Sequence, residues 1–233
     1  MFPEVRATSV AQPATRGWRA RPVEPGYLEY DRLLECQHRI KNHLLLAAGM
    51  LELQARQCAD EAARMVILSA HVRLQAVARL QSWTEGADDH AMVELEHYLG
   101  GYCYDLSEAL GLSEPLRGGP RLKVKIASCQ AAPDRAMTLA LIIGELVTNA
   151  VKHAHAGVIA VDWRAERDGW RLVVADDGRG LPSEATVESG LGSRLLTRMA
   201  ATLRGTWDIG TPGHHGAWIA LRIAPDVLSQ PRP

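Results

Sequence analysis

One histidine in the N-terminal part of the chain has neighbours that could assist a reaction. Residues 35–42 read ECQHRIKN, so His38 has Glu35 three positions before it and Asn42 four positions after it. On a helix these spacings place all three side chains on neighbouring parts of the surface. Imidazole is a good nucleophile near neutral pH, and a carboxylate that accepts its second ring N–H fixes the tautomer. The stretch therefore predicts a nucleophilic histidine, although such a residue in isolation is more often an ordinary solvated side chain.

A second group of polar residues interrupts an apolar stretch in the second half of the chain. Glu145 and Asn149 are four residues apart within LALIIGELVTNAV, so they share one face of the predicted helix. A carboxylate in such a run is costly to bury unless it has a partner or a function. The amide oxygen of an asparagine is a hard ligand suited to Mg²⁺, which takes its other ligands from phosphates and water.

Two glycine-rich stretches follow the Glu145–Asn149 pair. DDGRGLP starts at Asp176, directly after a strand ending in VVA, where a carboxylate could accept the exocyclic amine of a purine. Gly178 and Gly180 would let the backbone approach a ring and a sugar closely. SGLGS contains Gly190 and Gly192 and leads into a helix, whose first N–H groups favour phosphate. Each stretch is a weak signal when taken alone.

Together and in this order, the three stretches resemble the N, G1 and G2 boxes of a known ATP-binding fold. That fold is shared by histidine kinases, type II topoisomerases, Hsp90-like chaperones and mismatch-repair ATPases, and the resemblance covers about residues 122–223. It implies that Asp176 contacts adenine and that Asn149 holds Mg²⁺. It also implies that Glu145 orients or deprotonates the attacking group. The remaining residues implied are Lys152 and His153, facing the phosphates, and the pocket-shaping glycines Gly178, Gly180, Gly190 and Gly192.

The N-terminal half distinguishes among these ATPases. ECQHRIKNHLLL followed by LELQ resembles the phosphoacceptor helix of the HWE-like histidine kinases, whose box reads H-R-[VI]-K-N. HVRLQAVARL is similar to the arginine-bearing second helix of the same sub-family. The resemblance implies a protein-histidine kinase that uses Mg-ATP to phosphorylate His38 and then transfers the phosphoryl group to an aspartate of a response regulator receiver domain. His43 is a distant second candidate acceptor.

It stays open at this point which carboxylate acts as the base that accepts the proton of His38. Most histidine kinases carry an acid immediately after the histidine, and here that position is Arg39. Glu35 is the local candidate, and Glu145 could act from the ATP-binding region. The chain also departs from the sub-family pattern at Gly144, where a polar residue is usual, and at Ala217, where threonine often follows the glycine.

The elements that position His38 are predicted to be two long helices. Between residues 28 and 57, apolar and small residues recur at spacings of three and four, which places His38 at an exposed b position of a heptad. The seam consists of Leu33, Gln37, Ile40, Leu44, Ala47, Leu51, Gln54 and Cys58. A second helix over about 61–85 has a stripe formed by Val66, Ala70, Leu74, Val77 and Leu80. An antiparallel hairpin of this kind is expected to form a four-helix bundle in a homodimer.

The rest of the chain mixes helices and strands. Helices are predicted near 93–112, 133–154 and 195–203, with strands near 122–127, 158–163, 170–175, 206–209 and 217–223. The predicted fold class is α+β, with the helical hairpin followed by an α/β-sandwich ATP-binding domain of histidine kinase type. We divide the chain into a disordered leader (1–26), a dimerisation and phosphotransfer hairpin (27–88), an ATP-binding domain (89–226) and a tail (227–233).

Composition limits the other functions. The net charge of −1 favours neither nucleic acid nor an anionic membrane, and the four cysteines lack the spacing of a zinc site. Without a signal pattern or a long apolar run, the chain is expected to be cytoplasmic and to depend on a separate sensor or regulatory protein. Two alternatives are a non-catalytic phosphotransfer adaptor that binds response regulators and a serine/threonine kinase that sequesters a sigma factor. Decayed nucleotide boxes would favour the adaptor, and the sigma-factor kinase would not need the HRIKN helix.

Overall fold

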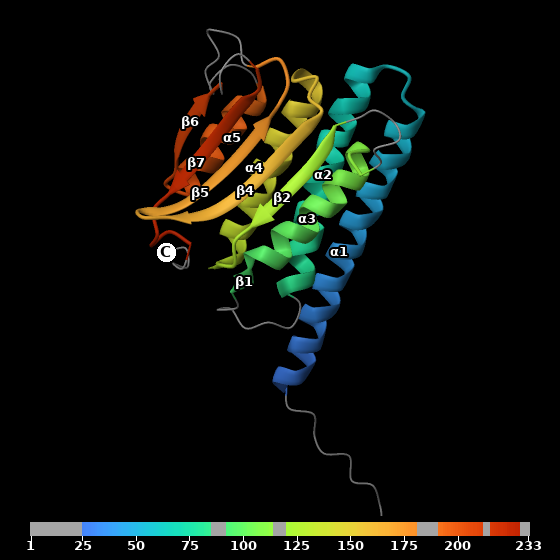
Figure 1. Cartoon of the computed structure of the whole chain (residues 1–233). Helices are drawn as coiled ribbons and strands as arrows, with labels where there is room; N and C mark the ends of the chain where they lie inside the picture. Colours follow the sequence, from blue (N-terminus) through green and yellow to red (C-terminus); the bar gives the residue numbers. More distant parts are fainter. Residues whose placement is uncertain (1–24, 85–91, 114–119, 181–190, 212–214, 229–233) are drawn as a thin grey trace, which may run out of the picture.

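The computed structural model describes residues 25–84, 92–113, 120–180, 191–211 and 215–228, without side chains for 25–34, 82–84 and 191–193. Its elements alternate in the predicted way, and the α+β class is confirmed (Figure 1). In chain order they are α1 (Pro25–Gln57), α2 (Glu61–Thr84), β1 (Val93–Glu94), α3 (Leu95–Leu110), β2 (Arg121–Ile126), β3 (Gln130–Ala131), α4 (Pro133–His153), β4 (Val158–Glu166), β5 (Gly169–Asp176), α5 (Leu191–Thr202), β6 (Thr206–Gly210) and β7 (Ala217–Ile223).

Helices α1 and α2 form the predicted antiparallel hairpin, which lies along one side of the molecule (Figure 1). Asp60 begins α2 by accepting hydrogen bonds from the backbone N–H groups of Ala62 and Ala63, as an N-cap residue does. Among the α1 side chains that the structure describes, the most buried are Ala48 and Ala55, one position after the predicted seam residues Ala47 and Gln54. The histidine face was predicted correctly, because His38 and Asn42 are both exposed.

A five-stranded sheet in the order β2-β4-β5-β7-β6 forms the other side of the molecule. β2 pairs with β4 in parallel, and all the other neighbours are antiparallel. Helices α3, α4 and α5 pack on one face of this sheet. The short β1–β3 ladder was not predicted, since two residues a side carry no periodic signal. α5 begins four residues before its predicted start.

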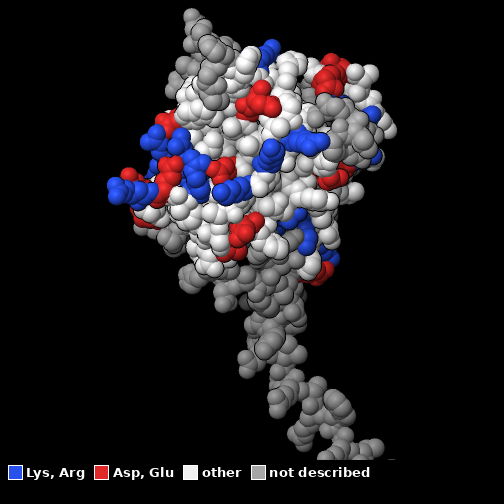
Figure 2. Space-filling model, in the orientation of Figure 1, with Lys and Arg blue, Asp and Glu red and all other residues white. Residues whose placement is uncertain are grey.

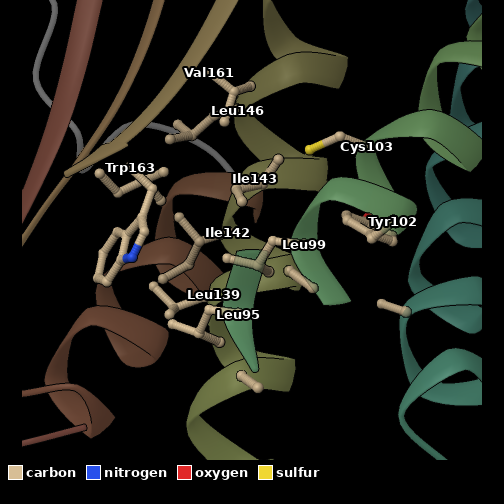
Figure 3. Close-up of a cluster of buried hydrophobic side chains, with 14 of the residues drawn as sticks. Leu95, Leu99, Tyr102, Cys103, Leu139, Ile142, Ile143, Leu146, Val161 and Trp163 are labelled. Carbon is tan, nitrogen blue, oxygen red and sulfur yellow. The ribbon is translucent and has the colours of Figure 1, made fainter. Parts of the chain in front are cut away.

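The main core lies between the sheet and helices α3 and α4. Figure 3 shows Leu139, Ile142 and Leu146 of α4 between Trp163 of β4 and the apolar face of α3. These α4 residues recur at spacings of three and four, which is why one face of the helix is apolar throughout. Burying each such side chain contributes about 1.5–3 kcal/mol, so the core fixes α4 firmly against the sheet.

Helix α2 belongs to the same core, and this was not predicted. Its residues Val72, Ala76 and Leu80, of which only Leu80 belongs to the predicted stripe, are buried with side chains of α3 and α4. The hydroxyl group of Tyr98 donates to the Ala76 carbonyl oxygen (3.0 Å), and that of Tyr102 donates to the Val72 carbonyl oxygen (3.4 Å). By contrast Val66, in the predicted stripe, is 65% exposed. α2 therefore has a second apolar face and lies between α1 and the helices of the sheet domain.

The sheet face opposite the helices is polar and ion-paired. Arg164 pairs with Asp162 and Glu166, and Arg171 pairs with Glu166 (3.3 Å). Figure 2 shows basic and acidic side chains side by side over this part of the molecule. Exposed pairs of this kind contribute about 0–1 kcal/mol each, so this face is a solvated surface that adds little stability.

Two buried groups of the core, Cys103 and Tyr102, are expected to make the fold less stable in alkali. Burial raises the pKa of the Cys103 thiol to about 12 and holds the pKa of Tyr102 well above its ordinary value. The folded state therefore keeps these protons after the unfolded chain has lost them, and stability falls as the pH rises above the unfolded pKa. At about pH 10 Cys103 alone should lower the free energy of unfolding by about 2 kcal/mol.

Urea unfolding at neutral pH and near pH 10 measures this effect. Cys103→Ala should reduce the loss between the two conditions, while replacement of the exposed Cys36 should leave it unchanged. Equal losses in wild type and Cys103→Ala would contradict the assignment.

Candidate functional site

The histidine of the HRIKN stretch is accessible on α1. His38, Glu35 and Asn42 are all exposed, as the helical spacing predicts. The Glu35 carboxylate accepts a hydrogen bond from the Arg39 guanidinium at 2.6 Å, one turn further along the helix. That pairing competes with any role of Glu35 as the acceptor for the His38 ring.

Residues 176–180 of the DDGRGLP stretch form a tight loop at the end of β5. A carboxylate oxygen of Asp176 accepts a hydrogen bond from the backbone N–H of Gly178 (2.9 Å), and Gly180 has a positive φ of 83°. A side chain at Gly178 would collide with the carbonyl group of Ala154, so only glycine fits there. The backbone N–H of Arg179 donates to that carbonyl oxygen at 2.9 Å. The loop thus contacts the chain immediately after α4.

Asp177 holds this loop in place, a role that the sequence did not indicate. Its Oδ1 accepts hydrogen bonds from the backbone N–H groups of Gly157 and Val158, at 2.7 and 2.8 Å. The backbone N–H of Gly216 donates to the Gly178 carbonyl oxygen at 2.6 Å and secures the other side of the loop. Asp177 therefore joins the loop after β5 to the start of β4.

The chain at the end of α4 contacts this loop through Ala154, and the last two turns of the helix carry three predicted site residues. Asn149 and Lys152 are half-buried, and His153 is exposed. The amide oxygen of Asn149 suits Mg²⁺, because that ion commonly takes few protein ligands and keeps phosphate and water oxygens. The two basic side chains suit the phosphate oxygens themselves. Gly192 lies in the first turn of α5, and Gly190 lies outside the described residues.

Glu145, one turn before Asn149 on α4, contacts α2. It is only 3% exposed, and its Oε1 accepts hydrogen bonds from Nε of Arg73 (2.5 Å) and from the Ser69 hydroxyl group (3.5 Å), both on α2. The hydrogen bond to Glu145 raises the pKa of Arg73, so this guanidinium stays charged. Sequence reasoning marked Glu145 as needing a partner, but it did not identify one 72 residues away.

The structure does not bring His38 and Glu145 together. Nδ1 of His71 lies 2.8 Å from the Ala48 carbonyl oxygen, which aligns this part of α2 with residue 48 of α1. His38 is ten residues earlier on α1, a separation of about 15 Å at 1.5 Å per residue. Ser69 and Arg73 flank His71 along α2, so Glu145 is held far from His38 along the hairpin.

Two family models match the chain, one in its N-terminal part and one in its C-terminal part. Residues 35–110 match the HisKA_2 family model, described as histidine kinase. Residues 134–226 match the HATPase_c model, described as histidine kinase-, DNA gyrase B- and HSP90-like ATPase. The first match includes α2 and α3, and the second includes the loop after β5.

Individual relatives agree with these matches. The chain is 29% identical to the sensor histidine kinase PdtaS of Mycolicibacterium smegmatis over 81% of its own length and 38% of that protein. It is 28% identical to blue-light-activated histidine kinase 2 of Erythrobacter litoralis over 84% of its own length and 58% of that protein. It therefore spans about two fifths to three fifths of these relatives.

A solved structure supports the fold of most of the chain. The histidine kinase domain of an Erythrobacter litoralis blue-light-activated histidine kinase superimposes with a TM-score of 0.61 at 26% identity. The match covers 87% of this chain and 98% of that one. Over the described residues, no helix has both the length and the apolar character needed to cross a bilayer.

Proposed function

Because the chain belongs to the HWE-like histidine kinases, with a C-terminal ATP-binding domain of the histidine kinase, gyrase B and Hsp90 type, we propose that it phosphorylates its own His38. ATP is the phosphoryl donor, and an aspartate in the receiver domain of a response regulator is the final acceptor. The observation that carries this proposal is an exposed HRIKN histidine in the same chain as a nucleotide-type loop joined to the end of α4.

The residues around the loop after β5 have distinct proposed roles. Asp176 accepts the adenine amine, and Gly178 and Gly180 admit the ring and sugar. Asn149 provides the protein oxygen for Mg²⁺, which would neutralise charge on the phosphates when bound. Lys152 and His153 contact the phosphate oxygens, as do the backbone N–H groups around Gly190 and Gly192.

The proposed step is a direct transfer to nitrogen. The lone pair of one imidazole nitrogen of His38 forms the N–P bond while the bond from γ-phosphorus to the bridging oxygen breaks and ADP leaves. The proton on the other ring nitrogen passes to a carboxylate, for which Glu35 and Glu145 are the candidates. Arg39 and Lys41 stabilise the phosphoryl group on the helix.

Exposed apolar side chains on the hairpin support a homodimer. Leu46, Met50 and Leu53 of α1 are 65%, 58% and 62% exposed, and Val66 of α2 is 65% exposed. These residues lie on the part of the hairpin that the ATP-binding domain leaves uncovered. Apolar side chains gathered in this way usually mark an interface, and a second copy of the hairpin would complete a four-helix bundle.

Labelling with γ-labelled ATP tests the proposal. Wild-type protein with Mg²⁺ should acquire label that is lost in acid and stable in alkali, and a receiver domain should remove it. Asn149→Ala should acquire little label. Acid-stable label, or equal labelling of wild type and Asn149→Ala, would contradict a histidine kinase of this type.

Replacing Asp177 should weaken nucleotide binding through the loop. Asp177→Ala removes the acceptor for two backbone N–H groups, and hydrogen bonds to charged groups contribute about 1.5–3 kcal/mol. We expect the dissociation constant for a non-hydrolysable ATP analogue to rise about tenfold, as measured by calorimetry. Asp168→Ala, in the exposed β4–β5 turn, is the matched control. Equal affinities of Asp177→Ala and wild type would exclude this positioning role.

A further inference from the structure

The candidate base Glu145 is enclosed by the contact between α2 and α4. Its carboxylate is engaged by Arg73 and Ser69, and only 3% of the residue is exposed. An imidazole must come within hydrogen-bond distance of a carboxylate to give up its proton. In this arrangement the enclosed carboxylate is not accessible to His38, whether His38 belongs to the same copy or to a second copy. The described structure is therefore a resting arrangement with respect to phosphorylation.

We propose that the Arg73–Glu145 ion pair holds the ATP-binding domain against α2 in this resting arrangement, and that autophosphorylation requires the pair to open. The inference rests on the proposed function, because it concerns the carboxylate that would act on His38. Arg73 controls the rate of autophosphorylation because it sets the fraction of molecules in which the contact between α2 and α4 is open. Only those molecules expose Glu145. Arg73 does not contact the reacting atoms.

The packing around the ion pair allows α2 and α4 to approach each other closely. Gly144 precedes Glu145 on α4, and a side chain there would collide with the hydroxyl group of Tyr102 and touch Val72 of α2. The Tyr102 hydroxyl group in turn donates to the Val72 carbonyl oxygen. Glycine within a helix costs about 1 kcal/mol relative to alanine. Its presence beside Glu145 lets α2, α3 and α4 meet where the ion pair forms.

Arg73 is placed so that the pair can open. Its side chain is 41% exposed, while that of Glu145 is 4% exposed. Water can therefore solvate the guanidinium as soon as the helices separate, and the carboxylate becomes accessible in the same movement. A second ion pair, Arg79–Asp105, joins α2 to α3 but involves no proposed site residue. It provides a matched control for the loss of a charge pair made by α2.

The test measures opening and kinase activity separately. Arg73→Met, Arg73→Lys, Arg79→Met and Gly144→Ala are prepared in the full chain, and binding of an ATP analogue confirms folding. Amide hydrogen exchange of α4 peptides around Glu145 reports opening without any need for activity. Initial rates of acid-labile labelling from γ-labelled ATP report autophosphorylation.

We expect faster exchange in Arg73→Met, with an initial labelling rate about tenfold above wild type, equivalent to about 1.4 kcal/mol. Arg73→Lys and Arg79→Met should resemble wild type in both measurements. Gly144→Ala should also open, because the added methyl group forces Tyr102 away from α4. Unchanged exchange in Arg73→Met, or faster exchange with an unchanged or lower rate, would overturn the proposal. If wild type acquires no label at all, the proposed function fails, while the exchange data still decide whether Arg73 closes the interface.

Discussion

Replacing His38 with glutamine is expected to reduce autophosphorylation at least ~10³-fold, to the background of the assay. Glutamine approximates the size and polarity of histidine but has no nitrogen lone pair that can form the N–P bond. The side chain at this position is exposed on α1, so the substitution should leave the hairpin and its packing against α2 intact. Labelling of the purified variant with γ-labelled ATP, compared with wild type under the same conditions, measures the effect.

His43→Gln is the matched control for this prediction. His43 is also exposed on α1 and lies five residues further along the same helix. It should retain wild-type labelling, because the resemblance places the acceptor at His38. Both variants should bind an ATP analogue normally, since neither residue belongs to the loop after β5. Label that persists in His38→Gln and disappears in His43→Gln would move the acceptor to His43.

Local patterns predicted most of the elements in this fold. The apolar face of residues 133–154 predicted α4, and the two apolar runs near 158–163 and 170–175 predicted β4 and β5, which pair as a hairpin. Periods of 3.6 and 2 residues are local properties, so a single sequence can contain them. The exposed position of His38 followed from the same reasoning. The chemical identity of the ATP-binding motifs came from resemblance, because each motif is weak alone.

Contacts between distant segments were not predictable in this way. α2 carries two apolar faces, and the sequence pattern favoured the face with Val66 over the buried face with Val72 and Ala76. Likewise Asp177 looked like part of a tight turn, although its hydrogen bonds to Gly157 and Val158 cross about twenty residues. In both cases the deciding interaction joins elements whose relative position only the folded chain defines.

Gly144 shows how such a contact explains a departure from the family pattern. The sub-family often has a polar residue at this position, and the sequence alone offered no reason for glycine. In the structure the hydroxyl group of Tyr102 occupies the space that a side chain at residue 144 would need. The burial that encloses Tyr102 also raises its pKa, so the hydroxyl group stays protonated and donates to Val72. Tyr102 of α3 therefore fills the space that a polar side chain at residue 144 would otherwise occupy.

The choice between Glu35 and Glu145 as the base has a clear expected result. Glu145→Gln should lower the initial rate of autophosphorylation by about 10²–10⁴-fold, the usual contribution of general acid–base catalysis. Glutamine has nearly the shape of glutamate but cannot accept the imidazole proton. Glu35→Gln should change the rate less than about threefold, because Glu35 is exposed and its carboxylate is paired with Arg39. Single-turnover labelling at saturating ATP separates this effect from nucleotide binding.

A double variant separates the role of Glu145 as base from its role in holding α2. Glu145→Gln also weakens the ion pair with Arg73, so opening of the interface alone would raise the rate and not lower it. If Glu145 is the base, Glu145→Gln combined with Arg73→Met must stay as slow as Glu145→Gln, because an open site without the carboxylate has no proton acceptor. Recovery of the rate in the double variant, or a large loss in Glu35→Gln alone, would assign the base to Glu35 and leave Glu145 with only its structural contact to Arg73.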